Sequence, residues 1–175
     1  MKPYDSQRAP NPYRLRVKSL RALALATALF APSAVWAQEI TVAGLDGTSK
    51  VLTAQALGDL PRATAALPNK GGEKAYEGPL LTYVLREAGA PAGAKLHGPA
   101  MKTYVVVRGA DGFSAVLSLA ETDKDFHDGA VILADQADGV KLTGKEGPYR
   151  LVIAGDKKAS RSVFGVARIE LRAAD

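Results

Sequence analysis

The chain has 175 residues, of which 23 are Lys or Arg, 18 are Asp or Glu and none is Cys. The absence of cysteine excludes disulfides, thiolate catalysis and cysteine-ligated metal sites. The formal net charge of +5 comes entirely from residues 1–37, which hold six basic residues and a single acidic one, Asp5.

Residues 1–37 have the pattern of an export signal. Basic residues precede the apolar run Ala22–Ala31, and the small-residue end Val35-Trp36-Ala37 suits signal peptidase. The run is shorter than the roughly 20 residues of a membrane-spanning helix. There is no Arg-Arg pair for twin-arginine export. We therefore expect Sec-type export, cleavage near Ala37, and a soluble periplasmic or secreted domain formed by residues 38–175.

The remaining residues carry 17 basic and 17 acidic side chains. This balance gives no global electrostatic support to a nucleic-acid or anionic-membrane partner. Any anion-binding site must therefore be local.

The first part of this domain predicts short strands and helices. Residues 39–51 predict a hairpin that turns at Asp46-Gly47. Thr53 suits the N-cap of a short helix over residues 54–60, which Pro61 ends. A strand over residues 62–67 and a polar loop over residues 69–74 follow.

The clearest helix is predicted between Gly78 and Gly89, at about residues 79–88. Pro79 suits the first helical position, and Gly89 suits the end. We expect the apolar face of this helix to pack on a sheet, and that face consists of Leu81, Val84, Leu85 and Ala88.

The second half predicts strands over residues 103–108 and 113–119, followed by a helical turn with a capping box at Ser118-Leu119-Ala120-Glu121. The second of these strands alternates polar residues with a predicted buried set: Phe113, Ala115, Leu117 and Leu119.

An apolar run over residues 130–134 and a hairpin turn at Asp138-Gly139 come next. Strands over residues 149–153 and 162–171 close the chain. In the last strand, Ile169 and Leu171 are predicted to point inward, while Arg168 and Glu170 face water. Many strands with one main helix predict an α+β fold with mainly β, mixed sheets rather than a doubly wound sheet.

The loop between the last two strands is the best candidate binding site. Lys157, Lys158, Arg161 and Ser162 place ammonium, guanidinium and hydroxyl donors within six residues, which is suited to a small anion. The alternative interpretation is a solvated surface loop, which is the commoner structure for a Lys-rich segment.

Other candidate sites have less support. The segment 122–128 offers oxygen and imidazole ligands, but its spacing matches no established metal site, so we predict a polar turn and no metal; its candidate ligands are Asp123, Asp125, His127 and Asp128. His97 is predicted to be a loop residue. No Gly-x-Ser-x-Gly elbow occurs, and with only two histidines no catalytic residue is predicted.

Taken in order, the segments resemble the molybdopterin-binding domain of sulfite-oxidase-type oxidoreductases over about residues 39–172, and are most similar to its small exported stand-alone members. YEGPLLTYVLREAG resembles the aromatic-x-Gly-x-x-Leu helix of that family. The other matching segments are LTAQALGDLP, GADGFSAVLSLAE, VILADQADGVKL, GPYRLVIAG and RSVFGVARIEL.

The resemblance implies where a cofactor would lie. Arg161-Ser162-Val163 corresponds to the Lys-Ser-Val element that lies against the cofactor in that family, and Arg150 corresponds to the arginine of its Arg-Leu-Val strand. The implied ligand contacts are therefore Arg150, Arg161 and Ser162, with Lys157 and Lys158 at the rim. Molybdopterin is the cofactor that the resemblance implies.

The family's molybdenum-ligating cysteine is missing. Its expected place is residues 67–75, LPNKGGEKA. The sequence therefore favours a non-catalytic binder of a small anionic ligand or a partner. The alternatives are a molybdopterin-dependent oxidoreductase with an unusual metal ligand, and an interaction module whose strand edge recruits an envelope protein. Whether side chains such as Tyr76 or Phe164 fill the cofactor site stays open at this point.

Overall fold

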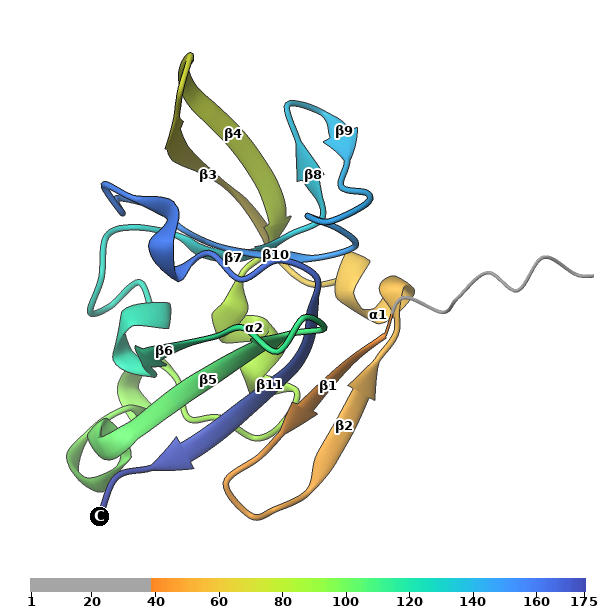
Figure 1. Cartoon of the computed structure of the whole chain (residues 1–175). Coiled ribbons are helices and arrows are strands. Elements are labelled where there is room, and N and C mark those ends of the chain that lie inside the picture. The colour runs from red at the N-terminus through yellow and green to blue at the C-terminus, as the bar shows by residue number, and fades with distance from the viewer. Residues whose placement is uncertain (1–38) are drawn as a thin grey trace, which may run out of the picture. The chain divides into compact units, whose positions relative to one another are not determined.

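The computed structural model describes residues 39–175 (Figure 1). The predicted export signal, residues 1–37 with cleavage near Ala37, lies outside the described residues. Within residues 39–175, no helix is long and apolar enough to cross a membrane.

The described chain is built mainly from strands. Its helices are α1 (Ala54–Gly58) and α2 (Leu81–Arg86), with single 3-10 turns η1 (Gly93–Lys95), η2 (Gly98–Lys102), η3 (Ala120–Thr122) and η4 (Ala159–Arg161). Its strands are β1 (Ile40–Ala43), β2 (Ser49–Leu52), β3 (Arg62–Asn69), β4 (Gly72–Pro79), β5 (Thr103–Gly109), β6 (Ser114–Ser118), β7 (Val131–Ala134), β8 (Gln136–Ala137), β9 (Val140–Lys141), β10 (Arg150–Ile153) and β11 (Val166–Ala173).

Five strands form the largest sheet, in the order β2-β1-β11-β5-β6. The last strand of the chain, β11, enters the middle of this sheet, where it pairs parallel with β1 and antiparallel with β5 (Figure 1). The sheet is therefore mixed, as the sequence predicts. Its inner face packs against α2, whose Leu81, Val84 and Leu85 are fully buried.

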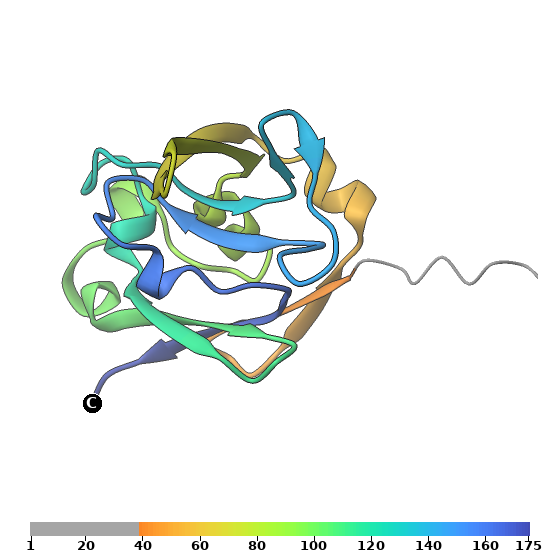
Figure 2. The same ribbon diagram turned by 45° about the horizontal axis from the view of Figure 1, so that its top comes forward.

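Strands β7 and β10 form a two-stranded ribbon between the five-stranded sheet and the four-stranded sheet β3-β4-β8-β9 (Figures 1 and 2). Every residue of both strands is buried. Leu133 and Leu151 face the main core, while Ile132 and Val152 face the smaller core under the four-stranded sheet. Burial on both faces explains why these strands read as continuous apolar runs.

Several predicted elements are confirmed. Strands β1 and β2 form the predicted hairpin, and Gly47 adopts a left-handed φ of 80° in its turn. The Oγ1 of Thr53 accepts the Ala56 N–H at 3.2 Å, which caps α1. The turn between β8 and β9 also has left-handed backbone at both central residues, Asp138 and Gly139.

Other predictions are wrong. Residues 69–74 are not a loop, because β4 begins at Gly72 and pairs residue by residue with β3. This strand continues through Pro79, so α2 begins only at Leu81 and ends at Arg86, short of the predicted residues 79–88. The predicted buried Phe113 is 47% exposed, because it lies in the turn before β6.

The outer face of the five-stranded sheet carries a charge cluster centred on β11. Glu170 accepts hydrogen bonds from Arg168 (2.8 Å) and Arg108 (3.3 Å), and also from Arg172. The Arg168 bond, opposed by partial burial and reinforced by Arg172 and Arg108, lowers the pKa of Glu170 to about 2. Because the folded-state pKa is depressed, this carboxylate stabilises the fold above its ordinary pKa of 4.5.

We therefore expect part of the stability to be lost as the pH falls from 4.5 toward about 2. Glu170→Gln should lower the urea midpoint at neutral pH and flatten the acid limb of stability against pH. Glu73→Gln, at an exposed residue of β4, is the charge-matched control. Equal acid limbs in wild type and Glu170→Gln would contradict this role for Glu170.

Candidate functional site

Arg150, which the sequence assigns to ligand contact, is buried at the start of β10. Its guanidinium lies 4.7 Å from the Tyr76 ring centroid and 4.4 Å from the Phe164 ring centroid. Its Nε donates to Ser162 Oγ at 2.7 Å, and its Nη1 donates to Glu146 Oε1 at 3.0 Å and to the Tyr76 hydroxyl. The arginine is thus stacked and hydrogen-bonded within the chain.

Ser162 also has internal partners. Its hydroxyl donates to the Leu151 carbonyl at 2.6 Å while it accepts from Arg150. The structure therefore brings Arg150 and Ser162 together, as predicted. Their contacts link β10 to the segment that leads into β11.

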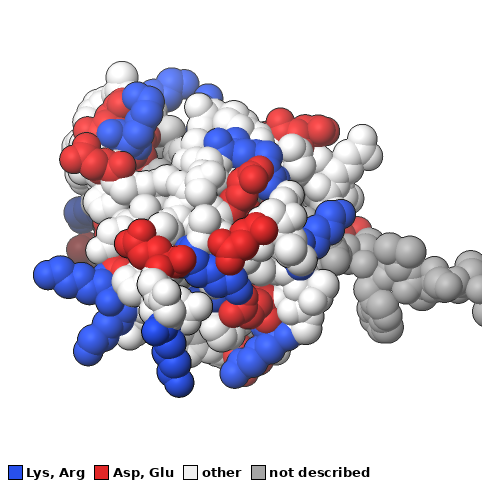
Figure 3. Space-filling view, turned by 90° about the horizontal axis from the view of Figure 1, so that it is seen from above, with Lys and Arg blue, Asp and Glu red and all other residues white. Residues whose placement is uncertain are grey.

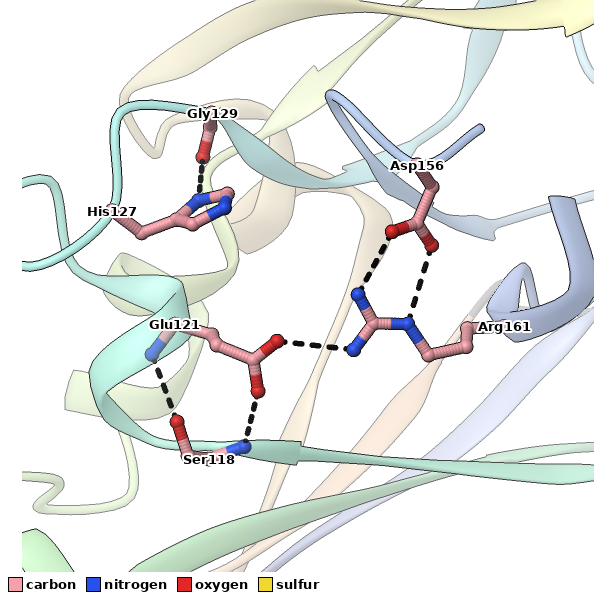
Figure 4. Close-up of polar contacts among 6 residues, drawn as sticks. All are labelled: Ser118, Glu121, His127, Gly129, Asp156 and Arg161. Carbon is pink, nitrogen blue, oxygen red and sulfur yellow. Dashed lines mark hydrogen bonds and ion pairs between the residues drawn. The ribbon is translucent and has the colours of Figure 1, made fainter. Parts of the chain in front are cut away.

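Arg161 lies beside two carboxylates rather than in an open cradle (Figure 4). Its Nε and Nη2 donate to Asp156 at 3.2 and 2.8 Å, and its Nη1 donates to Glu121 at 3.0 Å. The hydrogen bonds that Arg161 donates to Asp156 and Glu121 raise the pKa of Arg161. We call these three residues the Arg161 clasp. One cation shared by two carboxylates leaves it net negative, which opposes anion binding.

The clasp is held by the predicted capping box. Glu121 N–H donates to Ser118 Oγ at 3.2 Å, and Ser118 N–H donates to Glu121 Oε2 at 2.8 Å (Figure 4). Burial acts to raise the pKa of Glu121, but the Ser118 N–H and the Arg161 guanidinium outweigh it and lower that pKa. Glu121 therefore joins η3 to η4 as a charged group.

Lys157 and Lys158 are exposed, and neither belongs to any ion pair found in residues 39–175. Seen from above, cationic and anionic side chains are interspersed (Figure 3). Arg161 is paired with Glu121 and Asp156, so it does not form a single-sign cluster with the two lysines.

A cavity of about 540 Å³ lies elsewhere in the fold. One wall is formed by α2 and the residues that follow it, and the other by the segment that runs from η3 into β7. We call it the α2 cavity. Its volume is within the range of about 300–1,000 Å³ that small-molecule sites occupy. Its wall combines apolar and polar side chains, which include Tyr83, Arg86, Lys95, Asp123, His127 and Val131.

The acidic and imidazole groups of this cavity are fixed by backbone contacts. The buried Asp123 carboxylate accepts N–H groups of Gly93 (2.6 Å) and Asp125 (3.0 Å). Nδ1 of His127 lies 2.8 Å from the Gly129 carbonyl (Figure 4). A carbonyl only accepts, so Nδ1 carries a hydrogen, and in the neutral imidazole Nε2 is then the acceptor. Within residues 39–175, no three His, Asp or Glu side chains could hold a metal ion.

Two cations at the cavity wall have no carboxylate partner within ion-pair distance in the described part of the chain: Arg86 and Lys95. Arg86 stacks on the Tyr83 ring at 5.2 Å. Asp125, by contrast, is paired with Lys124 at 2.8 Å. Sequence reasoning missed Arg86 and Lys95, and the only available signal was the Tyr83–Arg86 spacing on one helix. His97 is exposed and lines a separate shallow hollow.

No family model matches the chain, and no curated protein matches its sequence. Among solved structures, it is similar to the sulfane dehydrogenase SoxCD from Paracoccus pantotrophus, with a TM-score of 0.55 and 22% identity. The likeness covers 77% of this chain but only 38% of that chain. At this identity the likeness is one of fold, and it supports the sulfite-oxidase-type fold that the sequence predicts.

Proposed function

We propose that this chain is a non-catalytic binding domain on an oxidoreductase-like fold, and that it takes a small anionic ligand in the α2 cavity. We also propose that it acts after export, in the periplasm or outside the cell. The leader pattern of residues 1–37 supports this location.

The residues at the implied cofactor position do not fit a molybdopterin. The chain has no thiol to bind the metal. Arg150 is stacked between Tyr76 and Phe164, and Ser162 uses its hydroxyl in two internal hydrogen bonds. Arg161 is held by two carboxylates. The side chains that would receive the cofactor phosphate thus already have partners.

The observation that carries the proposal is the pair of cations, Arg86 and Lys95, at the wall of a ligand-sized cavity. An arginine fork binds carboxylate or phosphate oxygens with two parallel hydrogen bonds, and a lysine adds a point charge. His127 Nε2 can accept a hydrogen bond from a ligand hydroxyl. A small hydroxyl-bearing carboxylate or phosphate ester matches these groups.

The test uses mature protein purified from its own exported compartment. We expect the mass of a chain that begins at Gln38. We also expect the molybdenum and pterin contents to be far below one per chain. The protein is titrated with citrate and with inorganic phosphate, and binding should shift the amide NMR signals of α2 and β7. The double variant Arg86→Gln/Lys95→Gln should weaken binding by at least about tenfold, because charge-assisted hydrogen bonds contribute roughly 1.5–3 kcal/mol.

The control is Lys157→Gln/Lys158→Gln, which removes the same charge from the loop that the sequence favours. It should leave binding unchanged. If only this control loses binding, the ligand binds at the loop that carries Lys157 and Lys158, and the cavity assignment is wrong. Stoichiometric molybdenum and pterin would overturn the non-catalytic proposal and favour the oxidoreductase alternative.

A further inference from the structure

The outer face of the five-stranded sheet presents three arginines to solvent. Arg168 and Arg108 are directly opposite each other on β11 and β5, and Arg172 lies four residues further along β11, opposite Tyr104. Between 39% and 48% of each of these side chains is exposed. We call this surface the arginine face.

This arrangement of like charges costs stability, which calls for an explanation. Like charges directly opposite each other on a sheet are destabilising. Glu170 is the carboxylate that pairs with all three arginines, so the cluster keeps two uncompensated positive charges. Sequences that break a local rule in this way commonly do so at functional surfaces.

Two of the arginines retain donors that Glu170 does not use. Arg108 and Arg168 each reach it through Nε, and their terminal Nη groups have no hydrogen-bond partner in residues 39–175. An arginine whose Nη groups are free can bind an incoming carboxylate with two parallel hydrogen bonds. The cluster is thus ready to receive acidic groups.

Apolar side chains flank the charges on the same sheet. Val116 on β6 is 55% exposed and pairs with Val106 beside Glu170, while Val51 on the opposite edge strand is 53% exposed. Tyr104 lies opposite Arg172. Arginine and aromatic residues next to apolar surface are the composition of protein interfaces.

We propose that the arginine face docks an acidic segment of a partner protein, independently of the α2 cavity. A small anion would find no enclosure on an open sheet. Nucleic acid calls for a longer basic stripe than three arginines, and the chain after residue 37 carries no excess of positive charge. Carboxylates on one face of an extended peptide lie about 7 Å apart, and long arginine side chains on adjacent strands can reach successive ones.

The test titrates the full mature chain with a synthetic peptide, acetyl-Glu-Glu-Leu-Glu-Glu-Tyr-Glu-Glu, followed by amide NMR shifts. Shifts should concentrate on β5, β6 and β11. Arg108→Gln/Arg168→Gln should weaken binding by at least about tenfold, consistent with the loss of two charge-assisted contacts. Lys157→Gln/Lys158→Gln, with the same change in net charge, should not weaken it.

A second variant separates binding from folding. Glu170→Gln removes the internal competitor, so it should tighten peptide binding although it destabilises the fold. Weaker binding by Glu170→Gln, or equal loss in the lysine control, would overturn the proposal. So would displacement of the peptide by equimolar inorganic phosphate, or tighter binding of a DNA oligonucleotide of equal charge.

Discussion

Arg150→Ala is expected to lower the free energy of unfolding by about 3 kcal/mol, because it removes a buried cation that pairs with Glu146. The wild-type side chain is 6% exposed and stacks against Tyr76 and Phe164. Its loss leaves a cavity beside two rings and removes one hydrogen-bond donor from each of Glu146 and Ser162. Glu146 is 34% exposed and can be rehydrated, which keeps the expected cost near the lower end for broken buried pairs.

Urea unfolding of the two proteins at neutral pH measures this difference. Arg168→Ala, at an arginine that is 46% exposed, is the matched control and should cost less than about 1 kcal/mol. Arg150→Lys should fall between the two, since it keeps the charge but not the planar fork. If Arg150→Ala unfolds like the control yet abolishes phosphate binding, Arg150 is a ligand contact as the sequence predicts.

Elements with a local cause could be predicted from the sequence. The β1–β2 turn depends on Asp46-Gly47, and the cap of α1 depends on a hydroxyl three residues from its partner. The capping box of η3 likewise spans only residues 118–121. Each requires no information beyond one turn of chain, so the pattern alone was sufficient.

Strand β4 could not be recognised in this way. Half of its residues are exposed, and its first residues lie in the predicted polar loop over residues 69–74. It is a strand because it pairs with β3 along its whole length and with β8 at Tyr76 and Glu77. Pairing with β3 across the two-residue turn at residues 70–71, and with the distant β8, outweighed local propensity.

The candidate site shows the same limit. Sequence pattern identified Arg150, Ser162 and Arg161 as a group, and the first two do touch. Their other partners come from far along the chain: Tyr76 lies 74 residues from Arg150, and Glu121 lies 40 residues from Arg161. A pattern that shows a cation does not show which carboxylate or ring the fold brings to it. Arg150, Arg161 and Ser162 are therefore internally paired, while Lys157 and Lys158 remain exposed.

The second large effect is expected at Gly78, the residue of β4 that lies against β7. A Cβ built there would lie 2.6 Å from the Ala134 Cα and still closer to the Leu133 carbonyl oxygen. Both atoms belong to the backbone of the fully buried ribbon, so neither can rotate away. Gly78→Ala must therefore separate β4 from β7, and we expect it to cost about 3 kcal/mol or more.

Gly71→Ala is the control at the tip of the same hairpin. A Cβ at Gly71 meets nothing within 4 Å, so its change in stability should stay within about 0.5 kcal/mol. Thermal and urea unfolding of both variants, with hydrogen exchange at Ile132 and Leu133, measures the difference. Loss of protection at these residues in Gly78→Ala would locate the damage at the contact of β4 with β7. Equal stabilities of the two variants would contradict this prediction, because they would show that the ribbon accommodates a methyl group at its contact with β4.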